Sequence, residues 1–556
     1  MTIGARSTQS DKLFSFFLFI SIGVNATGLF NEIIEPDAAL YAGIAKRMAI
    51  TNDWVNLYGD GYDWLDKPHF PFWMAAASFK VFGINAFAYK LPAFLFWLCS
   101  LRFTWLLARS LFDKGVAQIA VIIYATALHV VISNFDVRAE PYLTCCIAGS
   151  IYYMYMADKN GRLVDVLLAA IWMACAIMTK GIFVTVTIGG GFVLYWVFKK
   201  EWKQFFNYKW WLLLLFTFVL ILPELYCLYI QFDMHPEKVI FGKRNVSGVR
   251  FFFWDSQFGR FFNSGPIKGK GDYFFFFHTT IWAFIPWSIL FSIAVFKQFN
   301  RNFFVPQLQW ILYGSAAITF LLFTFSSFQL PHYIIIIFPH FAILTATYLN
   351  RVRDEIKRMK NLLLIQSILL GLAGVLLIGL ILLYNFRYTY AGAAFVLIVA
   401  GFLLTRYRKP ILENILIKTV LFSSILYLFL NLFFYPAILR YQSGMMAGKW
   451  IQETNAQGPI AIYRNFSYSF EFYAPGIIMQ TDDRKKLDPF ARGRKVLIYT
   501  AKENIKELEA ANYSVELLQS FSHFPVSKLD IKFLTNSTRQ TQVKEMVLVR
   551  VLLPSL

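Results

Sequence analysis

The sequence predicts an α-helical protein that crosses a membrane about thirteen times and carries a small α/β domain at its C-terminal end. Of its 556 residues, 57% are hydrophobic and only 15% are charged, whereas soluble proteins carry about 25% charged residues. Apolar runs of about 20 residues recur along most of the chain, and a helix of that length crosses a bilayer. The basic residues are also distributed unevenly between alternate loops, which is typical of polytopic membrane proteins.

The candidate spans lie at residues 13–30, 86–108, 116–133, 140–157, 163–179, 182–198, 210–231, 277–296, 308–326, 332–349, 361–384, 388–405 and 411–438. If the N-terminus lies in the cytoplasm, the inside segments hold 20 basic residues. The short outside loops then hold only three, Arg138, Lys180 and Arg387. Basic residues concentrate in cytoplasmic loops, so this distribution predicts that orientation.

Three polar segments are then expected outside the membrane, at residues 31–85, 232–276 and after about 440. The chain thus divides into a membrane domain, 1–440, and a C-terminal domain, 441–556. The tail alternates short β-type runs with one helical run, which predicts a small α/β domain. These runs lie at 460–463, 495–499, 502–511 and 546–552, of which 502–511 is the helical one.

The net charge of +20 would suggest nucleic-acid binding in a soluble protein. Here the basic residues are better explained by contact with anionic lipid headgroups, so we expect no nucleic-acid partner. The cysteines lie inside apolar runs, and their spacing fits neither a metal site nor a disulfide framework. They are Cys99, Cys145, Cys146, Cys175 and Cys227.

The stretch EPDAALYAGIAKRM, which begins at Glu35, follows the first apolar run. Pro36 can start a helix, and Asp37 in the first turn suits the positive end of the helix dipole. Apolar residues recur at a spacing of four, at Leu40, Ile44 and Met48. With Lys46 and Arg47 on other faces, this pattern predicts an amphipathic helix that lies on the membrane surface. A second, aromatic-rich helix is expected before residue 83.

Ionisable and polar side chains collect at the outer ends of the predicted spans. They are Asp37, Asp66, Lys67, Asp136, Arg138, Glu140, Lys180, Gln329, His332 and Tyr333. Each alone is explained as well by a helix-start charge or a surface ion pair. Charged groups at the membrane edge are costly, however, and tend to pair or to line a cavity. Their collection on one side therefore indicates chemistry on a charged lipid.

A sugar carried on a polyprenyl phosphate would need such groups. Breaking the sugar–phosphate bond leaves phosphate charge, which Lys, Arg or a metal ion must neutralise. The acceptor nucleophile needs a carboxylate nearby, either as general base or to hold it in line.

Six stretches resemble, in order and spacing, the aminoarabinose lipid A transferase branch of the polyprenyl-phosphate-sugar glycosyltransferases, which are relatives of the protein O-mannosyltransferases. EPDAALYAGIAKRMAITNDW is similar to PDExRYAEIAxxMxxxxDW, and LDKPHFPFWM is similar to EKPPLxYW. FKVFGINAFAYKLPA resembles FxxFGxxxFAxRLPS, and MTKG resembles LTKGP. FQLPHYIIIIFP resembles KLPxYxLPxxP, and FIPW resembles LPW.

The resemblance implies the GT-C fold and an inverting glycosyltransferase of the bacterial inner membrane, with its C-terminal domain in the periplasm. The donor would be a sugar on undecaprenyl phosphate, and the acceptor a lipid such as lipid A or, alternatively, a protein. Asp37 matches the aspartate taken as catalytic. Asp66 and Lys67 match a pair linked to metal and donor phosphate. Further matches in the site are Asp136, Arg138, Lys180, Arg260, Gln329, His332 and Tyr333.

The sequence departs from the family pattern at positions that bear on metal binding. Gln257 stands where the loop often has a histidine, and Gln329 replaces the lysine of KLP. No cofactor is therefore predicted with certainty; a divalent metal held by Asp66 and Asp136 stays an alternative. Two further alternatives are a transporter, whose coupling groups would lie at mid-membrane, and a scaffold that keeps the fold without activity.

Overall fold

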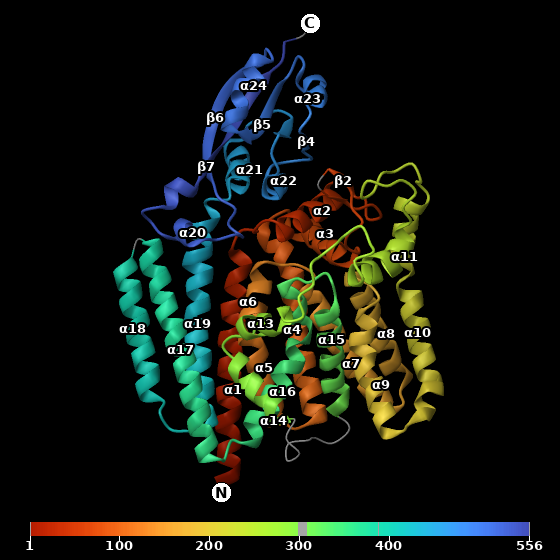
Figure 1. Cartoon of the computed structure of the whole chain (residues 1–556), viewed down its shortest axis with the longest axis vertical. Coiled ribbons are helices and arrows are strands. Elements are labelled where there is room, and N and C mark those ends of the chain that lie inside the picture. The colour runs from red at the N-terminus through yellow and green to blue at the C-terminus, as the bar shows by residue number, and fades with distance from the viewer. Residues whose placement is uncertain (1, 60, 299–308, 387, 555–556) are drawn as a thin grey trace.

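The computed structural model describes residues 2–59, 61–298, 309–386 and 388–554, so Arg387 lies outside it. Figure 1 shows a helical bundle with both a small sheet domain and the short helices of the first outer loop at one end. The helices of the bundle are α1 (Thr2–Thr27), α4 (Ala86–Leu111), α5 (Lys114–Thr126), α6 (Leu128–Phe135), α7 (Glu140–Asn160), α8 (Leu163–Lys180), α9 (Val184–Lys199), α10 (Tyr208–Leu220), α11 (Leu222–Leu228), α13 (Phe275–Ala283), α14 (Ser288–Gln298), α15 (Trp310–Phe325), α16 (Phe338–Arg351), α17 (Ile356–Tyr384), α18 (Thr389–Arg406), α19 (Leu412–Phe429) and α20 (Tyr435–Leu439).

The polytopic helical fold is confirmed, and every predicted span coincides with one or more helices. Within the described residues, eight helices are long and apolar enough to cross a membrane, or nine if the bent pair α5 and α6 forms one span. That pair bends by 54°. Helices α9, α14 and α15 are apolar but shorter, so the count of thirteen spans stays a prediction.

Close packing inside the bundle depends on small residues. A Cβ atom on Gly191 of α9 would lie 2.0 Å from the carbonyl oxygen of Ile311 on α15. Such a contact is impossible, so the glycine lets the two backbones approach, as small residues commonly do between membrane helices.

The first outer loop forms α2 (Asp37–Thr51), the strands β1 (Tyr58–Gly59) and β2 (Tyr62–Asp63), and α3 (Phe70–Phe82). The sequence predicted an amphipathic helix within residues 35–48, with Lys46 on a polar face. The helix is confirmed, but the exposed position of Lys46 is wrong, because Lys46 is only 5% exposed and its ammonium donates to backbone carbonyls of the C-terminal domain. Helix α2 is therefore enclosed between α3 and the tail.

The second outer segment, between α11 and α13, is built mainly from irregular helix. It contains η3 (Tyr229–Asp233), α12 (Gly248–Arg250) and η4 (Phe251–Gly259). Helix η4 has the wide π-helical turn, which often occurs at functional sites. Two further short helices continue directly into the helix that follows. Helix η7 (Pro331–Ile337) precedes α16, and η8 (Leu430–Phe434) connects α19 to α20.

The tail forms the small α/β domain that the sequence predicted. Its five strands lie in the order β4-β3-β5-β7-β6, with β3, β4 and β5 parallel and β7 antiparallel to both neighbours. The strands are β3 (Ile460–Tyr463), β4 (Met479–Thr481), β5 (Lys495–Ala501), β6 (Ser514–His523) and β7 (Lys544–Leu552). The helices are α21 (Ser443–Thr454), α22 (Tyr468–Tyr473), α23 (Arg484–Ala491), α24 (Ile505–Ala510) and α25 (Ile531–Leu534).

Side chains of β3 alternate between two cores, because successive residues of a strand point to opposite faces. Ala461 and Tyr463 pack with α23 and α24, whereas Ile460 and Ile462 pack with α21 and α22. Figure 1 shows α21 and α22 on the side of the sheet that faces the helical bundle. Helix α22 thus lies between the sheet and the first outer loop.

Candidate active site

Arg138, in the loop between α6 and α7, joins two of the predicted site carboxylates. Its Nη1 donates to Asp37 Oδ2 at 2.6 Å, and its Nη2 donates to Asp136 Oδ2 at 2.7 Å. Asp37 is the first residue of α2, where the helix dipole favours a negative charge. Nη1 also lies 3.2 Å from Nδ1 of His332. One guanidinium therefore holds the first outer loop against the ends of α6 and η7.

Electrostatics keeps this group charged. Burial lowers the pKa of Arg138, but the carboxylates of Asp136 and Asp37 outweigh it and raise the pKa above its ordinary value. For Asp136 the balance differs, because burial raises the pKa more than Arg138 lowers it. Asp37 is the more exposed carboxylate of the two, at 37% against 18% for Asp136. Asp37 is therefore the better placed to reach a substrate.

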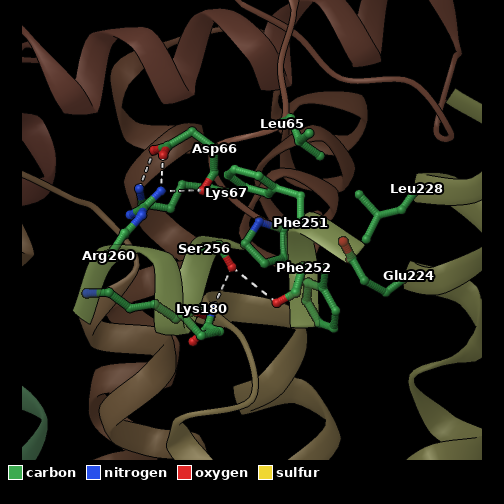
Figure 2. Close-up of a pocket in the computed structure, with 12 residues that line it drawn as sticks. Leu65, Asp66, Lys67, Lys180, Glu224, Leu228, Phe251, Phe252, Ser256 and Arg260 are labelled. Atoms are coloured by element: carbon green, nitrogen blue, oxygen red, sulfur yellow. Dashed lines mark hydrogen bonds and ion pairs between the residues drawn. The ribbon is translucent and has the colours of Figure 1, made fainter. Parts of the chain in front are cut away.

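Asp66 lies between two cations, Lys67 and Arg260, and forms ion pairs with both. Figure 2 shows these three side chains together at one end of a pocket. Burial raises the pKa of Asp66, but Lys67 and Arg260 outweigh it and lower the pKa to about 2. This ion-pair contribution to stability is thus complete above the ordinary pKa of about 4 and is lost only as the pH falls towards 2.

The pocket next to this cluster has a volume of about 30 Å³, room for about one water molecule. Its polar wall contains Asp66, Lys67, Lys180 and Arg260, and its apolar wall includes Phe251 of η4. Its lining residues come from the loop before α3, the end of α8, α11, η4 and the residue after η4, and Figure 1 shows α3 at the end of the bundle that carries the C-terminal domain. With Glu224 as a second carboxylate in the lining, the pocket has three cations and two carboxylates, an excess of one positive charge.

Lys180 forms a second, more deeply buried ion pair with Glu140. Lys180 Nζ lies 2.6 Å from Glu140 Oε1, and the two side chains are 10% and 2% exposed. The same ammonium lies 3.8 Å from the centre of the Tyr333 ring, a cation–π distance. His332 Nε2 lies 3.8 Å from Glu140, so His332 connects this pair to Arg138.

The two clusters lie close to each other. The pKa of Tyr41, on α2, is raised well above its ordinary value by burial and then by the carboxylates of Asp66, Asp37 and Glu140. Burial lowers the pKa of Lys67, and the carboxylates of Asp66 and Asp37 offset part of that shift. Contacts also connect the two clusters, because Lys180 lines the pocket and pairs with Glu140, which His332 links to Arg138 and Asp37.

The side-chain amide of Gln257 contacts the turn after α8. Its Nε2 donates to Ser256 Oγ at 2.6 Å and to the carbonyl of Lys180 at 3.4 Å. Gly181 has φ of +102°, and a Cβ atom there would lie 2.2 Å from Gln257 Nε2. The glycine of the MTKG stretch is therefore needed both for its backbone conformation and for the approach of Gln257.

The residues suggested for a divalent metal do not form a metal site in this arrangement. Asp66 is paired with two cations, and Asp136 is bound to Arg138. Gln257, at the usual histidine position, uses its amide in the hydrogen bonds above. Across the described parts of the chain, no group of three or more His, Cys, Asp or Glu residues could hold a metal ion.

Gln329 lies beside the site, and its side-chain amide forms hydrogen bonds with backbone groups. Its Nε2 donates to the carbonyls of Phe323 and Thr324 at 3.1 Å each, at the end of α15. Its Oε1 accepts from the backbone N–H of Asp272 at 2.8 Å. The side chain thus ties the second outer segment to α15, and it contacts none of the charged groups above.

A buried His–Glu pair that was not predicted from the sequence supports the pocket. His69 Nδ1 lies 3.0 Å from Glu224 Oε1, its Nε2 lies 2.9 Å from the carbonyl of Val55, and its backbone N–H donates to Glu224 Oε2 at 3.0 Å. Both side chains are fully buried. A carboxylate inside the apolar run 210–231 was the available signal, since such groups are costly unless paired. Glu140 was noticed in the sequence but not assigned to the site.

Replacement of Lys180 by methionine is expected to destabilise the protein by about 3–5 kcal/mol, because Glu140 is left buried without its cation. The measurement is thermal unfolding of the purified protein in detergent. The double variant Lys180→Met, Glu140→Gln should recover most of the loss, since no charge then stays unpaired. Equal melting temperatures for the single variant and the wild type would show that the pair does not form.

Comparisons with known proteins agree with this arrangement. Residues 66–227 match the family model described as dolichyl-phosphate-mannose-protein mannosyltransferase. An undecaprenyl phosphate-alpha-4-amino-4-deoxy-L-arabinose arabinosyl transferase from Edwardsiella ictaluri is 25% identical over 354 residues. That match covers 63% of this chain, which thereby spans 61% of the relative's length.

Two crystal structures of ArnT from Cupriavidus metallidurans have the same fold. The apo structure gives a TM-score of 0.72 at 17% identity and covers 96% of this chain and 97% of its own. The structure bound to undecaprenyl phosphate gives 0.71 at 17% identity, with 99% and 98% covered. The predicted GT-C fold is thus confirmed, because the chain shares the fold of these two ArnT structures.

Proposed function

We propose that this chain is an integral-membrane glycosyltransferase that moves a sugar from undecaprenyl phosphate, or a similar polyprenyl phosphate, to a lipid acceptor such as lipid A. The observation that carries the proposal is that Lys67 and Arg260 line one pocket with Lys180. From Lys180, contacts run through Glu140, His332 and Arg138 to the carboxylate of Asp37. That the related ArnT binds undecaprenyl phosphate supports this donor, and the arabinosyl transferase name of the relative supports the reaction.

In the proposed reaction, the acceptor oxygen attacks the anomeric carbon while the bond to the phosphate oxygen breaks. The phosphate leaves with the bonding electrons, and its growing charge is held by Lys67 and Arg260, which favour it most in the transition state. A hydroxyl acceptor gives its proton to Asp37 as general base. An acceptor phosphate is already ionised at neutral pH, and Asp37 then orients it. Attack from the opposite face inverts the anomeric centre.

The test is transfer in proteoliposomes from a panel of labelled undecaprenyl-phosphate sugars to lipid A or to an unfolded protein. Label on lipid A is the expected result. Label on protein would favour the protein O-glycosyltransferase, the candidate that the family match at 66–227 supports. Donor that crosses the bilayer without transfer would overturn the proposal in favour of a transporter.

We further propose that the site and the C-terminal domain face the periplasm and that the N-terminus lies in the cytoplasm. The excess of basic residues in the inside segments supports this orientation. The test places one cysteine at Glu509, in the tail, and another at Lys357, in the first turn of α17; both positions are exposed. An impermeant thiol reagent added to whole cells with a permeable outer membrane should label the first and spare the second. The reverse pattern would invert the topology.

Removal of divalent metal ions is expected to leave transfer unchanged. The cations that neutralise the leaving phosphate are supplied by the chain itself, and the oxygens of Asp66 are already paired. The measurement is the initial rate after dialysis against EDTA, with and without added Mg²⁺, Mn²⁺ or Zn²⁺. A rate that falls on dialysis and returns with one ion would show that a metal binds through a different ligand set.

A further inference from the structure

Helix α22 of the C-terminal domain is bound at its N-terminal end by the segment that leads into α2. Glu35 Oε1 accepts from Ser467 Oγ at 2.8 Å and from the backbone N–H of Ser469. Ser467 itself caps the helix by accepting from the N–H of Phe470. A carboxylate at this end complements the positive end of the helix dipole. Glu35 lies two residues before Asp37 in the chain.

The other end of α22 is bound by α2 itself. The ammonium of Lys46 donates to the carbonyls of Glu471, Phe472 and Ala474 at 2.7, 3.1 and 2.6 Å. All three of its protons are thereby used, and its positive charge complements the negative end of the dipole. A buried lysine with no ion pair is unusual, so this arrangement calls for an explanation beyond packing.

Further hydrogen bonds tie residues 32–35 to the tail. Tyr473 Oη accepts from the N–H of Ile33 at 2.8 Å and donates to Glu32 Oε2 at 2.7 Å. The amide of Gln442 accepts from the N–H of Glu35 at 2.9 Å and donates to the carbonyl of Ile33 at 2.8 Å. The chain on both sides of Asp37 is therefore attached to one domain that lies more than 400 residues later.

We propose that the C-terminal domain is a positioning element for the transfer reaction, and that α22 sets the place of α2 and hence of the Asp37 carboxylate. The inference rests on the proposed function. Lys67 and Arg260 belong to other elements, the loop before α3 and the residue after η4. Loosening α22 from α2 therefore displaces Asp37 while the phosphate-binding cations stay in place.

This separation predicts a distinct kinetic effect. Lys46→Met is expected to lower kcat by about 10- to 100-fold, because small displacements of a reacting group are costly. The KM for the donor should change less than about twofold, since Lys67 and Arg260 lie on elements other than α2. Lys502→Met, which breaks an exposed ion pair within the tail, is the matched control and should change neither quantity.

A readout that needs no catalysis is hydrogen–deuterium exchange of the full-length protein in detergent. In Lys46→Met, the amides of residues 37–51 and 468–473 should exchange faster than in the wild type and in Lys502→Met, while those of α4 stay protected. Unchanged exchange and unchanged kcat in Lys46→Met would overturn the inference. Faster exchange in a protein whose wild type transfers no sugar would instead count against the proposed function alone.

Glu35 gives an independent pair of variants at the other end of α22. Glu35→Gln keeps an oxygen that can accept from Ser467 and Ser469, whereas Glu35→Ala removes it. The alanine variant should therefore lose more of kcat and of α2 protection than the glutamine variant. Neither leaves a buried charge unpaired, so both should fold even where Lys46→Met does not accumulate. Wild-type behaviour of Glu35→Ala would also overturn the inference.

Discussion

Asp37→Asn is expected to lower kcat for sugar transfer by about 10²- to 10⁴-fold, the range typical of lost general-base or orienting catalysis. Asparagine keeps the size and still accepts from Arg138, so the loop that Asp37 anchors should stay in place. It cannot accept a proton, and it carries no charge to orient the acceptor. The measurement is kcat in proteoliposomes, with donor KM determined in parallel.

Asp63→Asn is the matched control, because it makes the same change in the same outer loop, at a carboxylate that pairs with Lys238. It should retain most of the activity. If Asp37→Asn transfers sugar at the wild-type rate, Asp37 does not act on the acceptor. A scaffold role for the whole chain is a separate question, and it would be indicated by a wild type that transfers nothing.

Lys67→Met is expected to lower kcat/KM for the donor by about 10²- to 10³-fold, the usual effect of removing one group that stabilises developing negative charge. Two results should appear together. The KM should rise because the ground-state phosphate loses a cation, and kcat should fall because the leaving phosphate carries more charge. Undecaprenyl phosphate, which lacks the sugar, should also bind more weakly in a thermal-shift titration.

Lys80→Met serves as the control, since Lys80 is an exposed lysine in the last turn of α3 and outside the pocket. Arg260→Lys addresses the partner cation, because lysine keeps the charge but loses the planar geometry that suits phosphate. Wild-type binding of undecaprenyl phosphate by Lys67→Met would place the donor phosphate elsewhere.

The membrane fold was predictable because it depends on local composition. Long apolar runs predict spans without any knowledge of distant contacts; loop charge likewise predicts an orientation, which stays a prediction. The motif resemblance pointed to Asp37, Lys67 and Arg260, whose roles stay predictions. In the structure Lys67 and Arg260 both pair with Asp66, and Asp37 pairs with Arg138. The spacing of these residues along the chain does not predict which of them are in contact, since Lys67 and Arg260 lie on different outer segments.

Other features depended on partners that are distant in the sequence. Lys46 looked like a surface charge because its partners lie 425 to 428 residues later. Glu224 was not singled out in the sequence, and its partner, His69, comes from a loop far away in the chain. Strand β6 was not predicted from the sequence. It lies at the sheet edge and about half of its residues are exposed, so it lacks a clear apolar pattern. In each case the local sequence was compatible with a simpler explanation.

The charge complementarity between α22 and the residues that flank Asp37 has a consequence for engineering. A chimera that exchanges the tail for that of a homologue would bring a foreign helix to Glu35 and Lys46, and it would fail even with every pocket residue intact. Grafting residues 32–46 together with the new tail should restore a working enzyme. The two segments are best treated as one transplantable module.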